Sequence, residues 1–141
     1  MKLTDLIICD DIRQEVGNKF TLVGVYDSEI RIQTSSPETL SWPLPLNIAL
    51  FCRVELEAND SGLDEFELQI THDGIEIVKL KSAILVGHKD RPIPITTRMP
   101  GFPITGAGVL RFDMRFSFKG ITIPTGIAPK SIRVSVERVL S

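Results

Sequence analysis

Residues 9–26 read CDDIRQEVGNKFTLVGVY, and the expected organisation of the chain starts from this stretch. An apolar run at 6–9 leads into it, and a second apolar run at 20–26 closes it. Between the two runs lie Asp10, Asp11 and a polar triplet, followed by the turn-forming residues 16–19. Because glycine and asparagine adopt the backbone conformations that tight turns need, we expect a long β-hairpin with a polar shoulder.

Alternation of apolar and polar residues continues along the rest of the chain, most clearly over 46–57, 110–119 and 132–137. Successive side chains of a strand point to opposite faces, so each stretch predicts a strand with one buried and one solvated face. No helical stripe is present, and a single helical turn is expected near 37–40. The predicted strands cover residues 4–12, 19–26, 29–33, 46–57, 65–72, 75–86, 109–118 and 130–139.

The connections between these strands complete the predicted fold. The proline-bearing segments 34–45 and 89–106 and the irregular stretch 120–129 are expected to be loops, because proline lacks the donor that a central strand needs. We expect the proline loops to cross between the two sheets. Asp73-Gly74 predicts a type I′ hairpin turn, and the shift of apolar phase after Ile77 predicts a bulge. We therefore predict one all-β domain over residues 1–141, an antiparallel β-sandwich of about eight strands.

Composition narrows the classes of function. The net charge is −2 and the lysines and arginines are dispersed among acids, so we expect neither a nucleic acid nor a membrane as partner. No apolar run approaches the roughly 18 residues of a spanning helix, and no signal peptide is evident, which predicts a cytoplasmic protein. Cys9 and Cys52 stand in apolar runs, either as buried thiols or as one disulfide.

The segment ICDDIRQEVGNKFTLVGVYDSEI, residues 8–30, resembles the opening of a family of short bacterial proteins of unknown function. Members begin with an apolar strand, an aspartate-rich shoulder, a glycine turn and a strand of the form Leu-hydrophobic-Gly-hydrophobic-aromatic. The resemblance implies a cytoplasmic β-sandwich with immunoglobulin-like or C2-like packing. The family carries no assigned activity, so the resemblance implies no catalytic residue.

Aspartates are the candidate metal ligands in this sequence. C2-like sandwiches bind calcium through carboxylate oxygens on loops at one end. Adjacent strand residues point to opposite faces, however, and two of the candidates stand in turn sequences. We interpret them as turn and surface residues, and we predict no metal and no cofactor. The four candidates are Asp10, Asp11, Asp60 and Asp73.

A hydrolytic enzyme at the Asp10/Asp11 shoulder is an alternative function. His72 beside Asp73 would supply an acid–base pair. Neither His72 nor His88 has an accompanying nucleophile or a third orienting group, so we interpret both as solvated residues at strand ends and predict no catalytic residue.

Apolar residues in the predicted loops suggest a binding module. Trp42 is either a lid on the core or an exposed anchor for a partner. The unusually apolar segment 89–106 either folds back on the core or contacts something else. A non-enzymatic protein-binding or assembly module, with a protein partner or self-association, is the first hypothesis, and a carrier of a small apolar ligand is a further alternative. The candidate contact residues are Trp42, Ile95, Met99 and Phe102.

Overall fold

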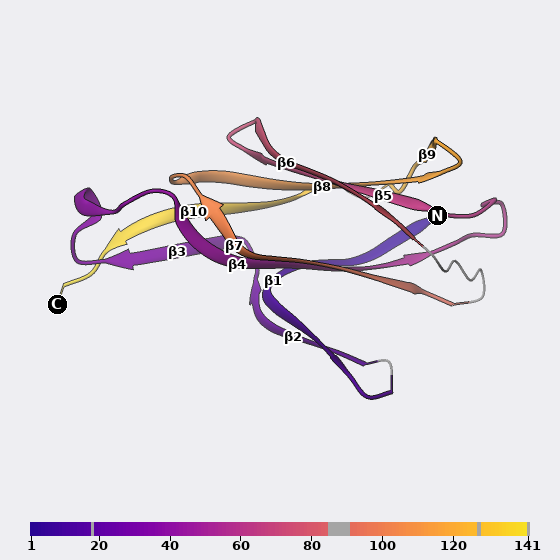
Figure 1. Ribbon diagram of the computed structural model, residues 1–141, viewed down its shortest axis with the longest axis horizontal. Coiled ribbons are helices and arrows are strands. Elements are labelled where there is room, and N and C mark those ends of the chain that lie inside the picture. Colours follow the sequence, from indigo (N-terminus) through magenta and orange to yellow (C-terminus); the bar gives the residue numbers. More distant parts are fainter. Residues whose placement is uncertain (18, 85–90, 127, 141) are drawn as a thin grey trace.

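The computed structural model describes residues 1–17, 19–84, 91–126 and 128–140, and it confirms a β-sandwich of two sheets (Figure 1). Its elements are β1 (Lys2–Glu15), β2 (Lys19–Tyr26), β3 (Glu29–Thr34), η1 (Pro37–Thr39), β4 (Leu44–Glu55), β5 (Glu65–His72), β6 (Ile75–Ala83), β7 (Ile93–Ile104), β8 (Gly108–Phe118), β9 (Ile121–Ile123) and β10 (Lys130–Arg138). Within the described ranges no helix is long and apolar enough to cross a membrane.

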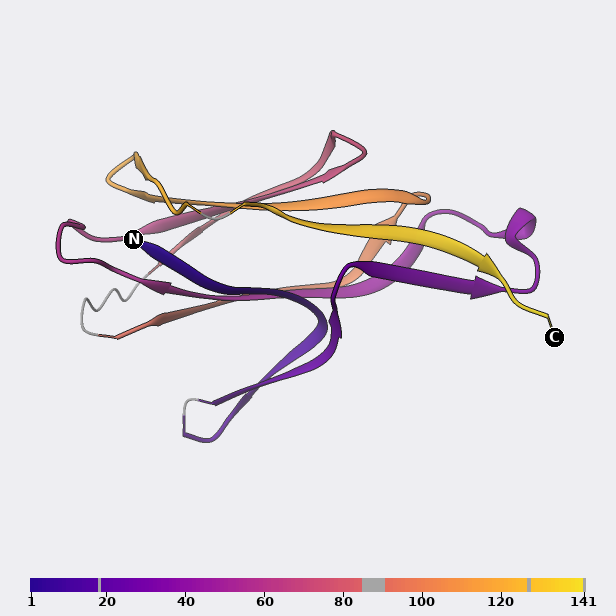
Figure 2. The same ribbon diagram turned by 180° about the vertical axis from the view of Figure 1, so that it is seen from behind.

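The two sheets lie face to face (Figure 2). The first has the strand order β2-β1-β4-β7, and the second has the order β3-β10-β8-β5-β6, with β9 paired to β8. Pairing is antiparallel except between β10 and β3, which run parallel. The segment 35–43, which contains η1, carries the chain from the second sheet to the first, so the predicted crossover and helical turn are confirmed.

The main core lies between the sheets and follows the predicted alternation. Its largest fully buried side chains include Phe112 and Phe116 of β8, Ile8 of β1, Leu50 of β4 and Leu68 of β5. Full burial of a side chain of this size contributes about 1.5–3 kcal/mol. Among the described residues no polar or charged side chain is buried, so the interior is held together by apolar packing.

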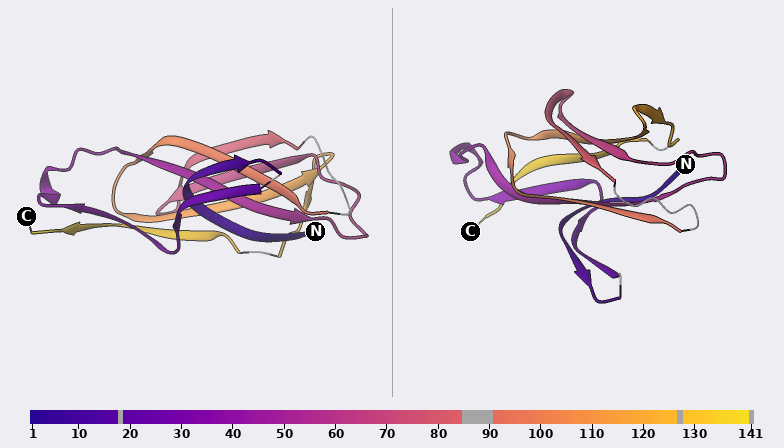
Figure 3. Two further views of the ribbon diagram at one scale, coloured as in Figure 1. Left: turned by 90° about the horizontal axis from the view of Figure 1, so that it is seen from below. Right: turned by 45° about the vertical axis from the view of Figure 1, so that its right-hand side comes forward.

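Strand β1 changes partner along its length. Residues 2–9 pair with β4, whereas residues 8–15 pair with β2. Beyond Cys9 the β1–β2 hairpin therefore leaves the sheet, and it projects away from the sandwich in the right-hand view of Figure 3. A second, small apolar cluster packs the hairpin against the outer face of the first sheet, with the Phe20 and Phe51 ring centroids 5.5 Å apart.

Strand β7 corrects the prediction that residues 89–106 form a loop. It pairs with β4 along its length, although it contains Pro94, Pro100 and Pro103. It has no neighbour on its other side among the described strands. Proline is tolerated on an edge strand, where its missing donor faces the free side, so the proline content indicated an edge rather than a loop. The short strand β9 likewise lies in a stretch expected to be irregular.

The strand conformation of β7 also decides where its apolar residues lie. Ile95 and Phe102, two of the candidate contact residues, are each only 5% exposed and belong to the main core, so this segment folds back on the core and neither side chain is an exposed anchor. Ile95 and Phe102 are seven residues apart, so strict alternation would turn them to opposite faces; the register shift between Leu46 and Ile48 of β4 brings both inward. Met99 and Trp42 are half-buried against the same core, which agrees with the lid alternative for Trp42.

The β5–β6 hairpin confirms the turn and bulge predictions. Asp73 and Gly74 both have positive φ, 49° and 83°, as a type I′ turn requires. His72 pairs with Ile75, but the register then shifts, so that Ile70 pairs with Val78. The predicted strand 75–86 ends at residue 83 within the described part, and residues 85–86 lie outside it.

Candidate functional site

Asp10 belongs to a compact motif in the opening hairpin. Its Oδ1 accepts a hydrogen bond from the Tyr26 hydroxyl, and burial together with this bond raises the pKa of Tyr26. The carboxylate lies over Gly24, where an added Cβ would stand 2.2 Å from Asp10 Oδ2. Gly24 also has a φ of +65°, which favours glycine. Three residues of the opening stretch thus form one structural unit.

Asp11 has a different partner. Its Oδ1 lies 3.8 Å from Nε of Arg98 on β7, and Arg98 Nη2 donates a hydrogen bond to the carbonyl oxygen of Ile12. Arg98 thereby ties the hairpin to the edge strand. Asp10 and Asp11 therefore have separate partners, as we expected for adjacent strand residues, whose side chains point to opposite faces. A hollow of about 370 Å³ beside them is lined by Asp10, Asp11, Asn47, Ile48, Arg98, Met99 and Pro100.

Asp60 and Asp73 stabilise turns at the two ends of β5. Asp60 Oδ2 accepts from the Glu57 backbone N–H at 2.7 Å and lies 2.8 Å from the amino group of Met1. Asp73 Oδ1 accepts from the backbone N–H of Val109 at 2.8 Å. The structure does not bring the four predicted aspartates together. In the described part of the chain, no group of three or more His, Cys, Asp or Glu residues is placed to hold a metal.

His72 holds the turn between β7 and β8 and is not the solvated residue that the sequence predicted. Its Nε2 lies 3.2 Å from the carbonyl oxygen of Ala107, to which it donates, and its Nδ1 lies 3.1 Å from Thr105 Oγ1. The Asp73 carboxylate is 4.0 Å from Nε2. Both ring nitrogens therefore have structural partners. His88, the other predicted histidine, lies outside the described residues.

The cysteines are buried free thiols. Cys52 belongs to the main core and Cys9 to the cluster on the outer face of the first sheet. Burial raises the pKa of Cys52 to about 12 and also raises the pKa of Cys9. Since the thiolate is the nucleophile, neither cysteine is suited to covalent catalysis.

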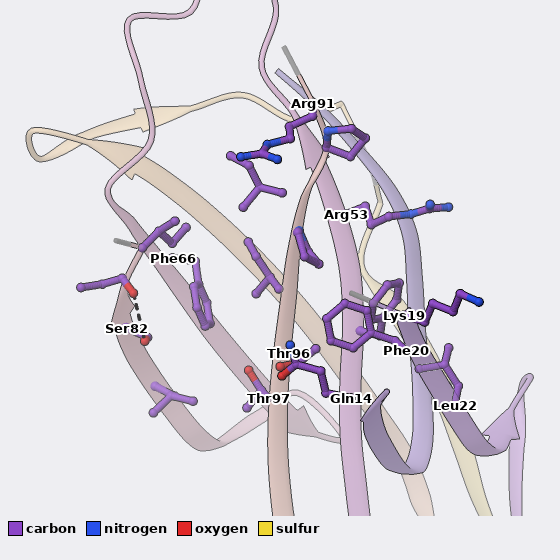
Figure 4. Close-up of a pocket in the computed structure, with 18 of the residues that line it drawn as sticks. Gln14, Lys19, Phe20, Leu22, Arg53, Phe66, Ser82, Arg91, Thr96 and Thr97 are labelled. Carbon is purple, nitrogen blue, oxygen red and sulfur yellow. Dashed lines mark hydrogen bonds between the residues drawn. The ribbon is translucent and has the colours of Figure 1, made fainter. Parts of the chain in front are cut away.

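A groove of about 1380 Å³ follows the free edge of β7 (Figure 4). Phe66 of β5 and Ser82 of β6 lie on one side of β7, between the two sheets. Phe20 and Leu22 of the opening hairpin lie on the other side. The groove therefore extends around the free edge of β7. It runs from the margin of the main core on one side to the apolar side chains of the β1–β2 hairpin on the other.

Apolar side chains form the floor of this groove. Leu80 of β6 pairs with Leu68 of β5, which is fully buried, yet Leu80 itself is 37% exposed. The difference arises because Leu80 lies on an edge strand at the margin of the sandwich. The nearly buried residues that line the groove are Phe66, Ile93 and Ile95 on the side of the main core and Phe51 on the side of the hairpin.

Cations surround the floor. Arg53 forms an ion pair with Asp5, and Lys81 Nζ lies 3.8 Å from Glu67 Oε2. The other two, Lys19 and Arg91, form no ion pair with any described carboxylate. No aspartate or glutamate is among the described residues that line the groove, whose charged residues are Lys19, Arg53, Lys81 and Arg91.

Sequence reasoning missed most of this groove. Of the predicted contact residues, Ile95 lines it and Met99 lines the smaller hollow, whereas Trp42 and Phe102 line neither. One sequence signal was available: lysines on both sides of Leu80 are typical of an edge strand.

Comparison of the chain with protein-family models finds no match, and comparison with curated proteins finds none either. The resemblance of residues 8–30 to a bacterial family therefore stays a prediction.

Proposed function

We propose that this chain is a non-enzymatic protein-binding module, and that its partner binds in the groove around the free edge of β7. The observation that carries the proposal is a groove along the unpaired edge of β7 whose apolar lining includes the partly exposed Leu80. Edge strands and apolar grooves are surfaces that extended protein segments recognise.

The chemistry of the remaining residues supports binding over catalysis. Asp10, Asp11, Asp73 and His72 each have a partner that stabilises a hairpin or a turn. A general acid or base must be within reach of a substrate, whereas these groups are engaged in the fold itself. The metal-dependent or hydrolytic alternative thus has no assembled site to support it in the described residues.

Transport of a small apolar ligand is the second candidate. The groove volume of about 1380 Å³ exceeds the roughly 300–1,000 Å³ of typical small-molecule pockets. Because it surrounds a strand edge, it does not enclose a ligand on all sides as such pockets do. These two properties favour a protein segment as the occupant.

We place the module in the cytoplasm as part of the same proposal. Cys9 and Cys52 are free thiols in separate apolar clusters, which suits a compartment that keeps thiols reduced.

The prolines of β7 interrupt the row of backbone donors at its free edge, which disfavours continuous strand pairing with a second copy of the chain.

The test compares two residues of β6. Leu80 lines the groove and is 37% exposed, whereas Ile77 does not line it and is 38% exposed. We expect proteins that copurify with the tagged chain from its native host to be retained by Ile77→Ser and lost from Leu80→Ser. Light scattering of the purified chain gives the self-association control. Retention of the same proteins by both folded variants would contradict the proposal.

A further inference from the structure

The groove collects positive charge from segments that are distant in the sequence. Lys19 begins β2, Arg53 lies in β4, Lys81 lies in β6, and Arg91 precedes β7. The chain as a whole has a net charge of −2, so this surface is locally opposite in sign to the rest of the molecule. Charge complementarity of this kind selects partners and speeds their encounter.

Two of the four cations form no ion pair with a carboxylate of the described residues. Arg53 and Lys81 pair with Asp5 and Glu67, while Lys19 and Arg91 pair with no described carboxylate. These two come from the hairpin and from the segment that enters β7, so their charge is available to a molecule that lies in the groove.

The floor requires apolar groups from the same occupant. Leu80 and the half-buried Phe20 and Leu22 expose apolar surface on the two sides of β7. Each apolar contact of this kind removes apolar surface from water, which favours binding. A segment with only acidic side chains would not cover the apolar floor, and a segment with only apolar side chains would not pair with the cations.

The free edge of β7 sets the conformation of the occupant. A proline in an edge strand turns its missing donor to the free side, so Pro94 and Pro100 interrupt the donors on that side. Backbone orientation repeats every second residue, which places Thr96, between these prolines, on the same side. The edge thus favours a short extended segment held mainly by its side chains over a full additional strand.

We propose that the groove binds an extended segment of a partner protein in which apolar side chains alternate with aspartates or glutamates. This rests on the proposed function, since it specifies the partner of the same groove. The apolar side chains occupy the floor between β6, β7 and the hairpin, and the carboxylates pair with Lys19 and Arg91. An extended strand directs alternate side chains to opposite faces, which allows one segment to satisfy both requirements.

The experiment is a selection from a random peptide library on the immobilised chain. Peptides of 12 residues match the length of β7. Enriched peptides are then measured by fluorescence anisotropy against the native chain and against two charge-reversed variants, Lys19→Glu/Arg91→Glu and Lys2→Glu/Arg111→Glu. Each variant exchanges two cations for two anions and takes the net charge from −2 to about −6, but Lys2 and Arg111 do not line the groove.

We expect the enriched peptides to alternate apolar and acidic residues. Their dissociation constants should rise about tenfold or more for Lys19→Glu/Arg91→Glu, stay within about twofold for Lys2→Glu/Arg111→Glu, and rise with salt. Enriched peptides without excess acidic residues, whose binding is still lost in Leu80→Ser, would overturn the acidic partner and leave the proposed function standing.

Two further outcomes would overturn the acidic partner, either together with the proposed function or in favour of the carrier alternative. If no peptide binds better to the native chain than to folded Leu80→Ser, both the acidic partner and the proposed function fail. If oleate, used as an anionic amphiphile, binds in the groove and displaces every enriched peptide at lower concentration, the carrier alternative replaces the acidic segment. Thermal denaturation of each variant confirms beforehand that it is folded.

Discussion

Substitution of Gly24 by alanine tests the motif that organises the opening hairpin. The backbone at Gly24 has a φ of +65°, and a residue with a Cβ pays about 1–2 kcal/mol in this left-handed region. The new Cβ would also stand 2.2 Å from Asp10 Oδ2, so the carboxylate must move and release the Tyr26 hydroxyl. Loss of that exposed hydrogen bond costs about 1–2 kcal/mol. We therefore expect Gly24→Ala to lower the free energy of unfolding by about 2–4 kcal/mol.

Urea denaturation followed by circular dichroism measures this loss, and the chain offers a matched control. Gly17 also has a left-handed φ, +82°, but an added Cβ there would meet nothing within 4 Å. Gly17→Ala should therefore cost only the backbone strain of about 1–2 kcal/mol. The cost of Gly24→Ala should fall to a similar value when Asp10 is replaced by alanine.

A double-mutant cycle decides whether the steric argument is correct. If Asp10→Ala and Gly24→Ala are additive within about 0.5 kcal/mol, the carboxylate does not depend on the missing Cβ. That result would refute the account of Asp10, Gly24 and Tyr26 as one unit. A coupling of about 1 kcal/mol or more supports it.

Three further predictions concern the core, the thiols and pH. Phe102→Ser should lower the free energy of unfolding by about 3–5 kcal/mol in urea denaturation, because Phe102 is buried; a loss below about 1 kcal/mol would place it at the surface. Cys52, with a pKa raised by burial to about 12, should resist thiol reagents in the native state and react in urea, and native-state labelling would contradict its burial. The Ser135 hydroxyl chiefly lowers the pKa of Glu29, so this carboxylate stabilises the fold above its ordinary pKa of 4.5 and the contribution is lost as pH falls through the lower folded value. Glu29→Gln should therefore reduce the loss of thermal stability in acid, and an unchanged profile of melting temperature against pH would contradict the role of this hydrogen bond.

Local sequence patterns predicted a structural feature correctly wherever one short stretch of sequence contained the physical cause of that feature. The type I′ turn at Asp73-Gly74 follows from two adjacent residues that tolerate positive φ. The bulge after Ile77 follows from a shift of apolar phase in a single strand. The same reasoning failed at Pro94 and Pro100, because the effect of proline depends on whether a strand is central or at an edge, and neighbours in a sheet are chosen by the whole fold.

The sequence by itself determined that this protein is an all-β sandwich. The alternation of apolar and polar residues with period two can be recognised in each strand separately, whichever strands are its neighbours. It also determined the hairpin around Gly17 and the crossover through η1. Only the tertiary structure decided that Asp10 lies over Gly24, that Ile95 and Phe102 are buried, and that dispersed cations from β2, β4, β6 and the entry to β7 surround one groove. The physical reason is that contacts between strands far apart in the chain depend on sheet order and register, which single-strand periodicity does not encode.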